Sequence, residues 1–193
     1  MPEIEQRTGA ADSPAPAGGF SQWLASIPLT VRMIIYGIFF LGFTLGLLPY
    51  LASRIEYYWP VCRIEIGWFR LVGAVMFLFF LTVYLWGSYL LSKLGRGAYV
   101  EFDPPRQFVC VGPFRWCRNP IAGCVVGMIL GEAIAFSSTG IMLLFLVALP
   151  LAHLQVVLIE EPLLHQRFGA SYDEYRTRVS RWLPHRPRNE AAS

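Results

Sequence analysis

The C-terminal half of the chain decides the fold, because its polar motifs lie at the ends of two apolar segments. Residues 112–120 read GPFRWCRNP, residues 160–162 read EEP, and residues 168–184 read FGASYDEYRTRVSRWLP. Residues 121–159 are mostly apolar and are interrupted by the turn sequence SSTG at 137–140. Two antiparallel membrane-length segments return the chain to the same side of a bilayer. We therefore expect the polar motifs to meet at one membrane face.

The composition of the whole chain agrees with a membrane protein. Its 193 residues are 55% hydrophobic and 15% charged, and the mean hydropathy is +0.46. Soluble domains carry roughly 25% charged residues, so the deficit indicates lipid as the surrounding medium. The net charge of +3 is small and scattered, which excludes a nucleic-acid-binding surface. The length fits one domain.

Four segments are long and apolar enough to span a membrane, which needs about 20 residues. They are residues 29–51, 68–91, 120–136 and 141–160. The sequence thus predicts an all-α integral membrane fold with four transmembrane helices. Within it we expect a domain over residues 29–185, a disordered N-terminal tail over 1–28 without a signal peptide, and a short tail over 186–193.

Two short cytoplasmic amphipathic helices are expected after the fourth span. Pro162 predicts that the span ends at the carboxylate pair, because proline cannot continue a helix and biases the residue before it toward extended backbone. Gly169 predicts the end of the first short helix. Residues 171–174 read SYDE, a capping-box pattern that predicts the start of the second. Tyr172 and Tyr175 share a face of that helix, directed at the bilayer or at the site.

The distribution of basic residues predicts the orientation. Lysine and arginine are concentrated between the second and third spans and in the C-terminal tail, whereas residues 52–67 contain only Arg54 and Arg63. The positive-inside rule then places both termini in the cytoplasm. The four cysteines show no metal-ligand spacing, so we expect small buried hydrophobic residues and no metal site. They are Cys62, Cys110, Cys117 and Cys124.

Glu160 and Glu161 are the first candidates for binding chemistry. Neighbouring helical residues point about 100° apart, so both face one ligand only if the helix ends there. One carboxylate could then accept hydrogen bonds from a ribose diol or an ammonium group. The alternative is a structural role, in which the pair is bonded to Arg115, Arg118 or Arg181.

Arg118, Asn119 and Pro120 open the third span. Pro120 at the first helical position leaves unpaired N–H groups that favour a carboxylate, and Asn119 is also a good N-cap. For Arg115 and Arg118 the alternative is positive charge that sets topology.

Several other residues allow two interpretations. The intramembrane His153 could handle a proton or make an interhelical hydrogen bond, and Glu132 is expected to be a snorkelling or hydrogen-bonded interfacial group. Gly123, Gly127 and Gly131, at four-residue intervals, favour close helix packing. A nucleotide turn at residues 95–97 has weak support, because the GRG sequence lacks a strand–helix context.

The motifs resemble those of the isoprenylcysteine carboxyl methyltransferases and the related phospholipid methyltransferases, in particular integral membrane members of bacterial type. The family pattern is G-P-Y-R, R-H-P or R-N-P, an apolar hairpin, E-E-P, F-G, two tyrosines and V-P-R-x-x-P. This chain matches it over roughly its C-terminal half. It differs at Asn119, where eukaryotic members have His, at Ala122 in place of Tyr, and at Ser180 in place of Pro.

The resemblance implies an enzyme that uses S-adenosyl-L-methionine as its cofactor, in a pocket at the cytoplasmic interface of a bacterial inner membrane. Polar parts of the cofactor would be bound by Arg118, Asn119 and Pro120, with Glu160 or Glu161 on its ribose or ammonium. Arg115, Tyr172, Tyr175 and Arg181 would shape the pocket. The acceptor would be a lipophilic small molecule or a prenylated or lipid group that presents a carboxylate, amine or thiol.

Methyl transfer of this kind needs alignment and desolvation rather than a metal or a covalent nucleophile, so the sequence assigns no catalytic residue. Two other functions stay open at this point. One is an NADPH-dependent lipid or sterol reductase of similar architecture. The other is a non-enzymatic membrane scaffold in which the glutamate pair is only a structural anchor.

Overall fold

The computed structural model describes residues 26–58, 66–96 and 106–183, and every regular element within these ranges is helical. Residues 1–25 of the N-terminal tail expected over 1–28, the tail expected over 186–193 and Cys62 lie outside the described residues. The first long helix consists of α2 (Leu29–Leu41), the π-helical turn η1 (Gly42–Leu47) and α3 (Leu48–Tyr58). The second consists of η2 (Gly67–Phe69), α4 (Arg70–Leu90) and η3 (Leu91–Gly95).

The C-terminal half begins with the 3₁₀ turn η4 (Gly112–Arg115) and α5 (Pro120–Phe136). It continues through α6 (Thr139–Gln155), the π-helical turn η5 (Val156–Glu160), α7 (Glu161–Phe168) and α8 (Ala170–Arg178). Three continuous helices are long and apolar enough to cross a membrane, namely Leu29–Tyr58, Gly67–Gly95 and Thr139–Phe168. The apolar α5 is shorter, at 17 residues. The predicted all-helical membrane fold is therefore confirmed, with three long spans.

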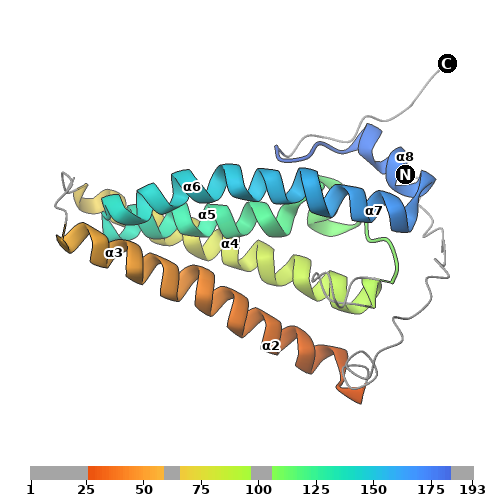
Figure 1. The fold of residues 1–193 in the computed structure, drawn as a ribbon, viewed down its shortest axis with the longest axis horizontal. Helices are drawn as coiled ribbons and strands as arrows, with labels where there is room; N and C mark the ends of the chain where they lie inside the picture. Colours follow the sequence, from red (N-terminus) through yellow and green to blue (C-terminus); the bar gives the residue numbers. More distant parts are fainter. Residues whose placement is uncertain (1–25, 59–65, 97–105, 184–193) are drawn as a thin grey trace.

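α4 and α5 pack against each other more extensively than any other pair of helices (Figure 1). A Cβ atom added at Gly73 would lie 2.7 Å from the Gly131 carbonyl oxygen, and one added at Gly131 would lie 2.8 Å from the Phe77 backbone nitrogen. At Gly127 it would lie 2.6 Å from the Phe80 ring, whereas at Gly123 it would meet nothing within 4 Å. Gly127 and Gly131 therefore allow α5 to pack closely against α4 of the same chain, as predicted for this glycine series. Gly123 does not take part in this contact.

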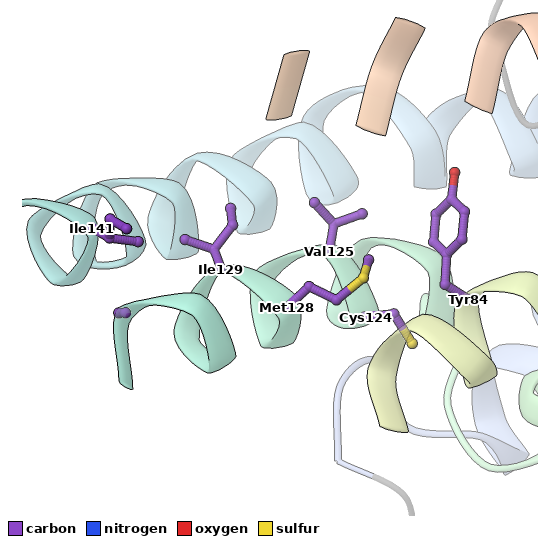
Figure 2. Packing of buried hydrophobic residues seen from close by; sticks show 7 residues of the cluster. Tyr84, Cys124, Val125, Met128, Ile129 and Ile141 are labelled. Atoms are coloured by element: carbon purple, nitrogen blue, oxygen red, sulfur yellow. The ribbon is translucent and has the colours of Figure 1, made fainter. Parts of the chain in front are cut away.

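The buried core lies between α4, α5 and α6 (Figure 2). α5 contributes most of it, and Met128 and Ile129 are 0% and 2% exposed. Tyr84 from α4 and Ile141 from α6 complete the cluster in Figure 2. α5 is thus the central helix of this bundle, which explains why so apolar a helix shows little difference between its faces.

The predicted tight turn joins α5 to α6 as an antiparallel hairpin. Ser137 ends α5 with a left-handed backbone, and the Ser138 hydroxyl caps α6 by accepting the Ile141 N–H at 3.2 Å. The same hydroxyl donates to Glu56 Oε2 at 2.6 Å, and the Gly140 N–H donates to that oxygen at 3.2 Å. Glu56 therefore attaches the end of the first long helix to this turn.

The first long helix packs mainly at its α3 end, with a smaller contact between α2 and η3. Figure 1 shows α3 beside the α5–α6 turn and α2 diverging from the other helices. No residue in the most apolar window of Leu29–Tyr58 is buried. The contact at the α3 end is close, because a Cβ atom at Gly140 would lie 2.3 Å from the Ala52 carbonyl oxygen.

The prediction that Pro162 ends the fourth span is wrong. The helix continues from Thr139 to Phe168, and Glu161 has helical backbone angles rather than extended ones. A proline clashes with the carbonyl of the residue four positions earlier, and for Pro162 that residue lies within the widened turn η5. Pro49 follows η1 in the same way. In both helices a π turn accommodates the proline without breaking the helix.

The junction of the last two helices differs in detail from the prediction. Gly169 ends α7 with a positive φ of 48°, as expected for a terminating glycine. However, α8 begins at Ala170, with Gly169 as its N-cap and no side-chain cap. The expected capping role of Ser171 is therefore wrong, because the glycine turn has already started the helix.

Candidate functional site

A buried ion-pair cluster around Glu161 forms at the end of the bundle where α5 begins and α7 and α8 meet (Figure 1). Arg181 donates from Nε and Nη2 to the two Glu161 carboxylate oxygens, at 2.7 and 2.9 Å. Arg118 Nη1 lies 3.3 Å from Glu161 Oε1. Glu161 is 8% exposed, and a carboxylate so buried is stable only with such compensation. The bidentate contact also fixes the orientation of the Arg181 and Glu161 side chains.

The segment after α8 docks onto the loop before α5 and so assembles this cluster. The Arg118 backbone N–H donates to the Ser180 carbonyl at 2.8 Å. The Arg181 carbonyl accepts from Cys117 Sγ at 3.2 Å and from Asn119 Nδ2 at 3.4 Å. These three contacts bring two arginines that are far apart in sequence to the same carboxylate.

The two predicted pocket tyrosines form the inner face of α8. Tyr172 is 1% exposed, and its ring meets the Phe108 ring edge-on at 6.1 Å. The Tyr175 ring lies 5.0 Å from the same Phe108 ring, and its hydroxyl donates to the Phe114 carbonyl at 2.5 Å. The shared face predicted for these tyrosines is confirmed, and it is directed into the protein.

The protonation of the side chains around Glu161 follows from burial and charge. Burial raises the pKa of Tyr172, and the neighbouring charge of Glu161 raises it further. Burial also raises the pKa of Tyr175 and of the Cys117 thiol. The hydrogen bond to Glu161 raises the pKa of Arg181. At neutral pH the phenols and the thiol are therefore protonated donors, and Arg181 is charged.

Glu160 and Arg115 lie apart from this arrangement. Glu160 Oε1 accepts a hydrogen bond from Gln155 Nε2, on the preceding helical turn, at 3.4 Å. The two glutamates diverge because the helix runs on through both of them. Arg115 is exposed at the end of η4, and its positive charge acts on the Cys110 thiol.

Asn119 and Pro120 begin α5 as predicted, but the side chain of Asn119 plays a different part. Pro120 is the first residue of the helix, and the Asn119 carbonyl accepts the Gly123 N–H at 3.1 Å. The Asn119 side chain makes no capping bond, since it donates to the Arg181 carbonyl instead. The amide thus connects the helix start to the docked segment, and the expectation of a side-chain cap is wrong.

Of the two interpretations of His153, the hydrogen bond is the one found. Trp182 Nε1 donates to His153 Nδ1 at 3.0 Å. The partner belongs to the docked segment after α8, however, rather than to another spanning helix. The hydrogen bond between Trp182 and His153 therefore also attaches the segment after α8 to α6.

Arg118 and Tyr172 interact with each other at the edge of the cluster, and each has a buried polar atom with hydrogen-bonding capacity left. Arg118 Nε and the Tyr172 hydroxyl are buried and make no hydrogen bond of normal geometry to the described residues. Buried donors are normally satisfied, so two of them beside an arginine pair fit an anionic group such as a carboxylate. No group of three or more His, Cys, Asp or Glu side chains in the described part of the chain could hold a metal ion.

Sequence reasoning missed Phe108 and Cys117 as members of this site. Phe108 contacts Phe168, Tyr172 and Tyr175 through its ring. Phe108 opens the apolar run FVCV at residues 108–111, which gave no sign of contact with the distant tyrosines. Cys117 was treated only as a small hydrophobic residue, and its contact with the Arg181 carbonyl depends on a docked segment that no local pattern announces.

Comparison with known families agrees with this geometry. The family model described as phospholipid methyltransferase matches residues 68–171. The chain belongs to the phospholipid methyltransferase family. The match runs from the second long helix to the start of α8 and includes Arg118 and Glu161, while Arg181 lies beyond it. No curated protein and no solved structure matched.

The long apolar helices indicate a multi-pass membrane protein. The family to which the chain belongs is a methyltransferase family whose substrates are lipids.

Proposed function

We propose that this protein transfers a methyl group from S-adenosyl-L-methionine to a lipophilic or membrane-associated acceptor, at the end of the bundle that holds Glu161. The observation that carries the proposal is the Arg118–Glu161–Arg181 cluster, of which Arg118 and the buried Glu161 lie within the region of the family match. Family membership favours this function over the NADPH-dependent reductase and over the scaffold. When bound, S-adenosyl-L-methionine would supply a methyl group activated by its positively charged sulfur.

In this proposal Arg118 binds the carboxylate of the cofactor. Its Nε is a buried donor without a hydrogen bond of normal geometry to the described residues, and Glu161 holds the rest of the guanidinium from the other side. Arg181 neutralises Glu161 and so keeps that carboxylate from repelling the ligand. Asn119, Pro120 and the α5 N-terminus complete the anion site.

Glu160 has a different part in the proposal. It lies on another side of the helix from Glu161, where its carboxylate could accept from a ribose diol or an ammonium group. Tyr172 and Tyr175 form the wall beside the arginines and, with Phe108, exclude water from it. A dry wall removes water as a competing methyl acceptor. Arg115, exposed at the rim, would contact the acceptor or the headgroups.

The acceptor in this proposal enters from the bilayer and presents a carboxylate, an amine or a thiol. The polar cluster lies next to long helices whose apolar side chains are exposed, such as Leu158 and Leu154. An acceptor carried on a lipid or prenyl chain would therefore reach the site without leaving the membrane. Alignment of donor and acceptor supplies the catalysis.

We also propose that α5 is a fourth span and that both termini are cytoplasmic. A helix of 17 residues is about 25 Å long, near the lower limit for crossing the hydrocarbon core. Its packing along α4 and the concentration of basic residues at the Glu161 end support this arrangement.

Calorimetric titration of S-adenosylmethionine and S-adenosylhomocysteine into the purified full-length protein in detergent tests the proposal. We expect micromolar binding to the wild type and a loss of at least about 30-fold in Arg118→Ala, since a charge-assisted contact contributes about 2 kcal/mol. Arg178→Ala is the matched control, because Arg178 is an exposed arginine paired with Glu174 on the surface of α8.

Two outcomes would contradict the proposal. Folded wild-type protein that binds neither compound would exclude the cofactor. Equal binding by Arg118→Ala and Arg178→Ala would exclude the Arg118 end of the bundle as the site. Glu160→Gln then tests the ribose or ammonium contact, with a weaker loss of about 10-fold expected.

A further inference from the structure

A cavity lined by both apolar and polar side chains lies at the end of the bundle opposite the Glu161 cluster, beside the α5–α6 turn. Its volume is about 790 Å³, and it lies between η1 and α3 of the first long helix, the end of α5 and the start of α6. Such a volume falls within the usual range of small-molecule sites. Charged side chains in a cavity between apolar helices need a ligand or another charge to compensate them.

Glu132 is the side chain that this cavity leaves uncompensated. It lines the cavity and is only 8% exposed, yet its Oε2 accepts no hydrogen bond from the described residues. The last turn of α5, where it lies, is otherwise apolar. An ionisable group within a membrane helix is costly unless a partner satisfies it, so the missing partner indicates a ligand.

The other side chains of the cavity indicate the charge and shape of that ligand. Glu56 adds a second carboxylate, which accepts from Ser138 and from the Gly140 N–H. Tyr50 and Tyr57 line the same cavity with exposed rings. Carboxylates together with aromatic rings favour an organic cation. In the described ranges no three metal-ligating side chains come together.

Arg70 supplies the opposite charge at this cavity. Its Nε donates to the Ala135 carbonyl at 2.8 Å, which uses one of the five guanidinium N–H groups. The remaining donors lie on an exposed side chain and suit a phosphate oxygen. Glu132 and Arg70 together therefore match a group that carries an ammonium and a phosphate close to each other.

We propose that this cavity binds an alkylammonium group, with Glu132 as its counter-ion and Arg70 beside the attached phosphate where the ligand is a phospholipid headgroup. The site is separate from the Glu161 cluster, because α5 rises about 18 Å from Pro120, where the cluster lies, to Glu132. A ligand bound here is therefore held away from the proposed methyl transfer. The proposal does not depend on the cofactor.

Thermal unfolding of the full-length protein in detergent tests this site. The probes are short-chain phosphatidylethanolamine, phosphatidylglycerol of the same chain length, and free ethanolamine. We expect saturating phosphatidylethanolamine to raise the Tm of the wild type by about 5 °C, and phosphatidylglycerol to have a clearly smaller effect. Glu132→Gln removes the charge with little change of shape and should abolish the difference between the two lipids.

Matched variants and the free amine distinguish the outcomes. Glu174→Gln makes the same chemical change on the exposed face of α8 and should keep the wild-type response. Arg70→Gln should weaken the response to the phospholipid but not to ethanolamine. A Tm shift with ethanolamine alone that Glu132→Gln abolishes would support the site with a soluble amine as its ligand.

Three results would overturn the proposal. The first is an equal response to both lipids with none to ethanolamine. The second is a preference for the amine that survives in Glu132→Gln. The third is a preference lost in Arg118→Ala but kept in Glu132→Gln, which would place the amine at the other end of the bundle. None of them bears on cofactor binding, which the calorimetric titration measures separately.

Discussion

Two buried glutamates lie at opposite ends of the same bundle, and their surroundings are opposite in kind. Glu161 receives two hydrogen bonds from Arg181 and an ion pair from Arg118. Glu132 is equally buried, at 8% exposed, but its Oε2 accepts no hydrogen bond from the described residues. A paired carboxylate holds protein segments together, whereas an unpaired one is available to a ligand. Burial alone therefore does not reveal the role of a membrane carboxylate.

The largest effect is expected from Glu161→Ala. Without the carboxylate, Arg118 and Arg181 remain close together as like charges, and the segment after α8 loses its main attachment. We expect the free energy of unfolding in detergent to fall by about 3 kcal/mol. Glu174→Ala is the control, since its exposed pair with Arg178 contributes about 0.5 kcal/mol. Equal losses in the two variants would mean that Glu161 is not the attachment point that its contacts indicate.

A smaller effect is expected where α4 and α5 meet, because this contact fixes the distance between the two ends. Gly131→Ala places a methyl group 2.8 Å from the Phe77 backbone nitrogen, so α5 must move. We expect a loss of about 2 kcal/mol in unfolding free energy. Gly123→Ala, two turns earlier and open on all sides, should leave stability unchanged or slightly higher. A similar loss at both positions would argue against close packing as the role of this series.

Glu132→Gln distinguishes the two glutamates by the sign of its effect. In lipid-free detergent an amide is less costly to bury than an unpaired carboxylate, so we expect unfolding free energy to rise by about 1 kcal/mol. Glu161→Gln should lower it, because the arginines lose their counter-charge. Chemical or thermal unfolding of both variants under one condition measures the difference. The comparison would fail if both substitutions changed stability in the same direction.

The sequence predicted the helical membrane fold, the α5–α6 hairpin and some of the residues that meet around Glu161, among them Arg118 and Arg181. These follow from apolar length and from polar residues at helix ends, which are local signals. The continuation of the helix through Pro162 was not predictable, because no particular residue type marks the π turn that accommodates the proline. Pro49 follows the same kind of turn, whereas Pro150 lies inside α6 without one, so a proline does not by itself mark such a turn.

Longer-range contacts account for the other differences between prediction and structure. The side chain of Asn119 serves the Arg181 carbonyl, 62 positions away in sequence, and not its own helix. The cavity at Glu132 also depends on the approach of the first long helix to the α5–α6 turn. Glu132 was expected to be a snorkelling or hydrogen-bonded interfacial group, and the structure buries it beside the cavity, where its Oε2 accepts no hydrogen bond from the described residues. No pattern within α5 indicates that the first helix closes over this end.

Tyr175→Phe is expected to have an effect of the same small size as Glu132→Gln, and it tests how completely the polar atoms at the Glu161 end are paired. The Tyr175 hydroxyl donates to the carbonyl of Phe114, which is itself buried, so removing it leaves that carbonyl without this donor. We expect a loss of about 1 kcal/mol in unfolding free energy. Tyr57→Phe at the other end, where the ring is 76% exposed, should change stability by less than about 0.5 kcal/mol. If the two variants were indistinguishable by thermal unfolding, the hydroxyl of Tyr175 would not contribute to docking α8, and the pairing at this end would depend on the arginines alone.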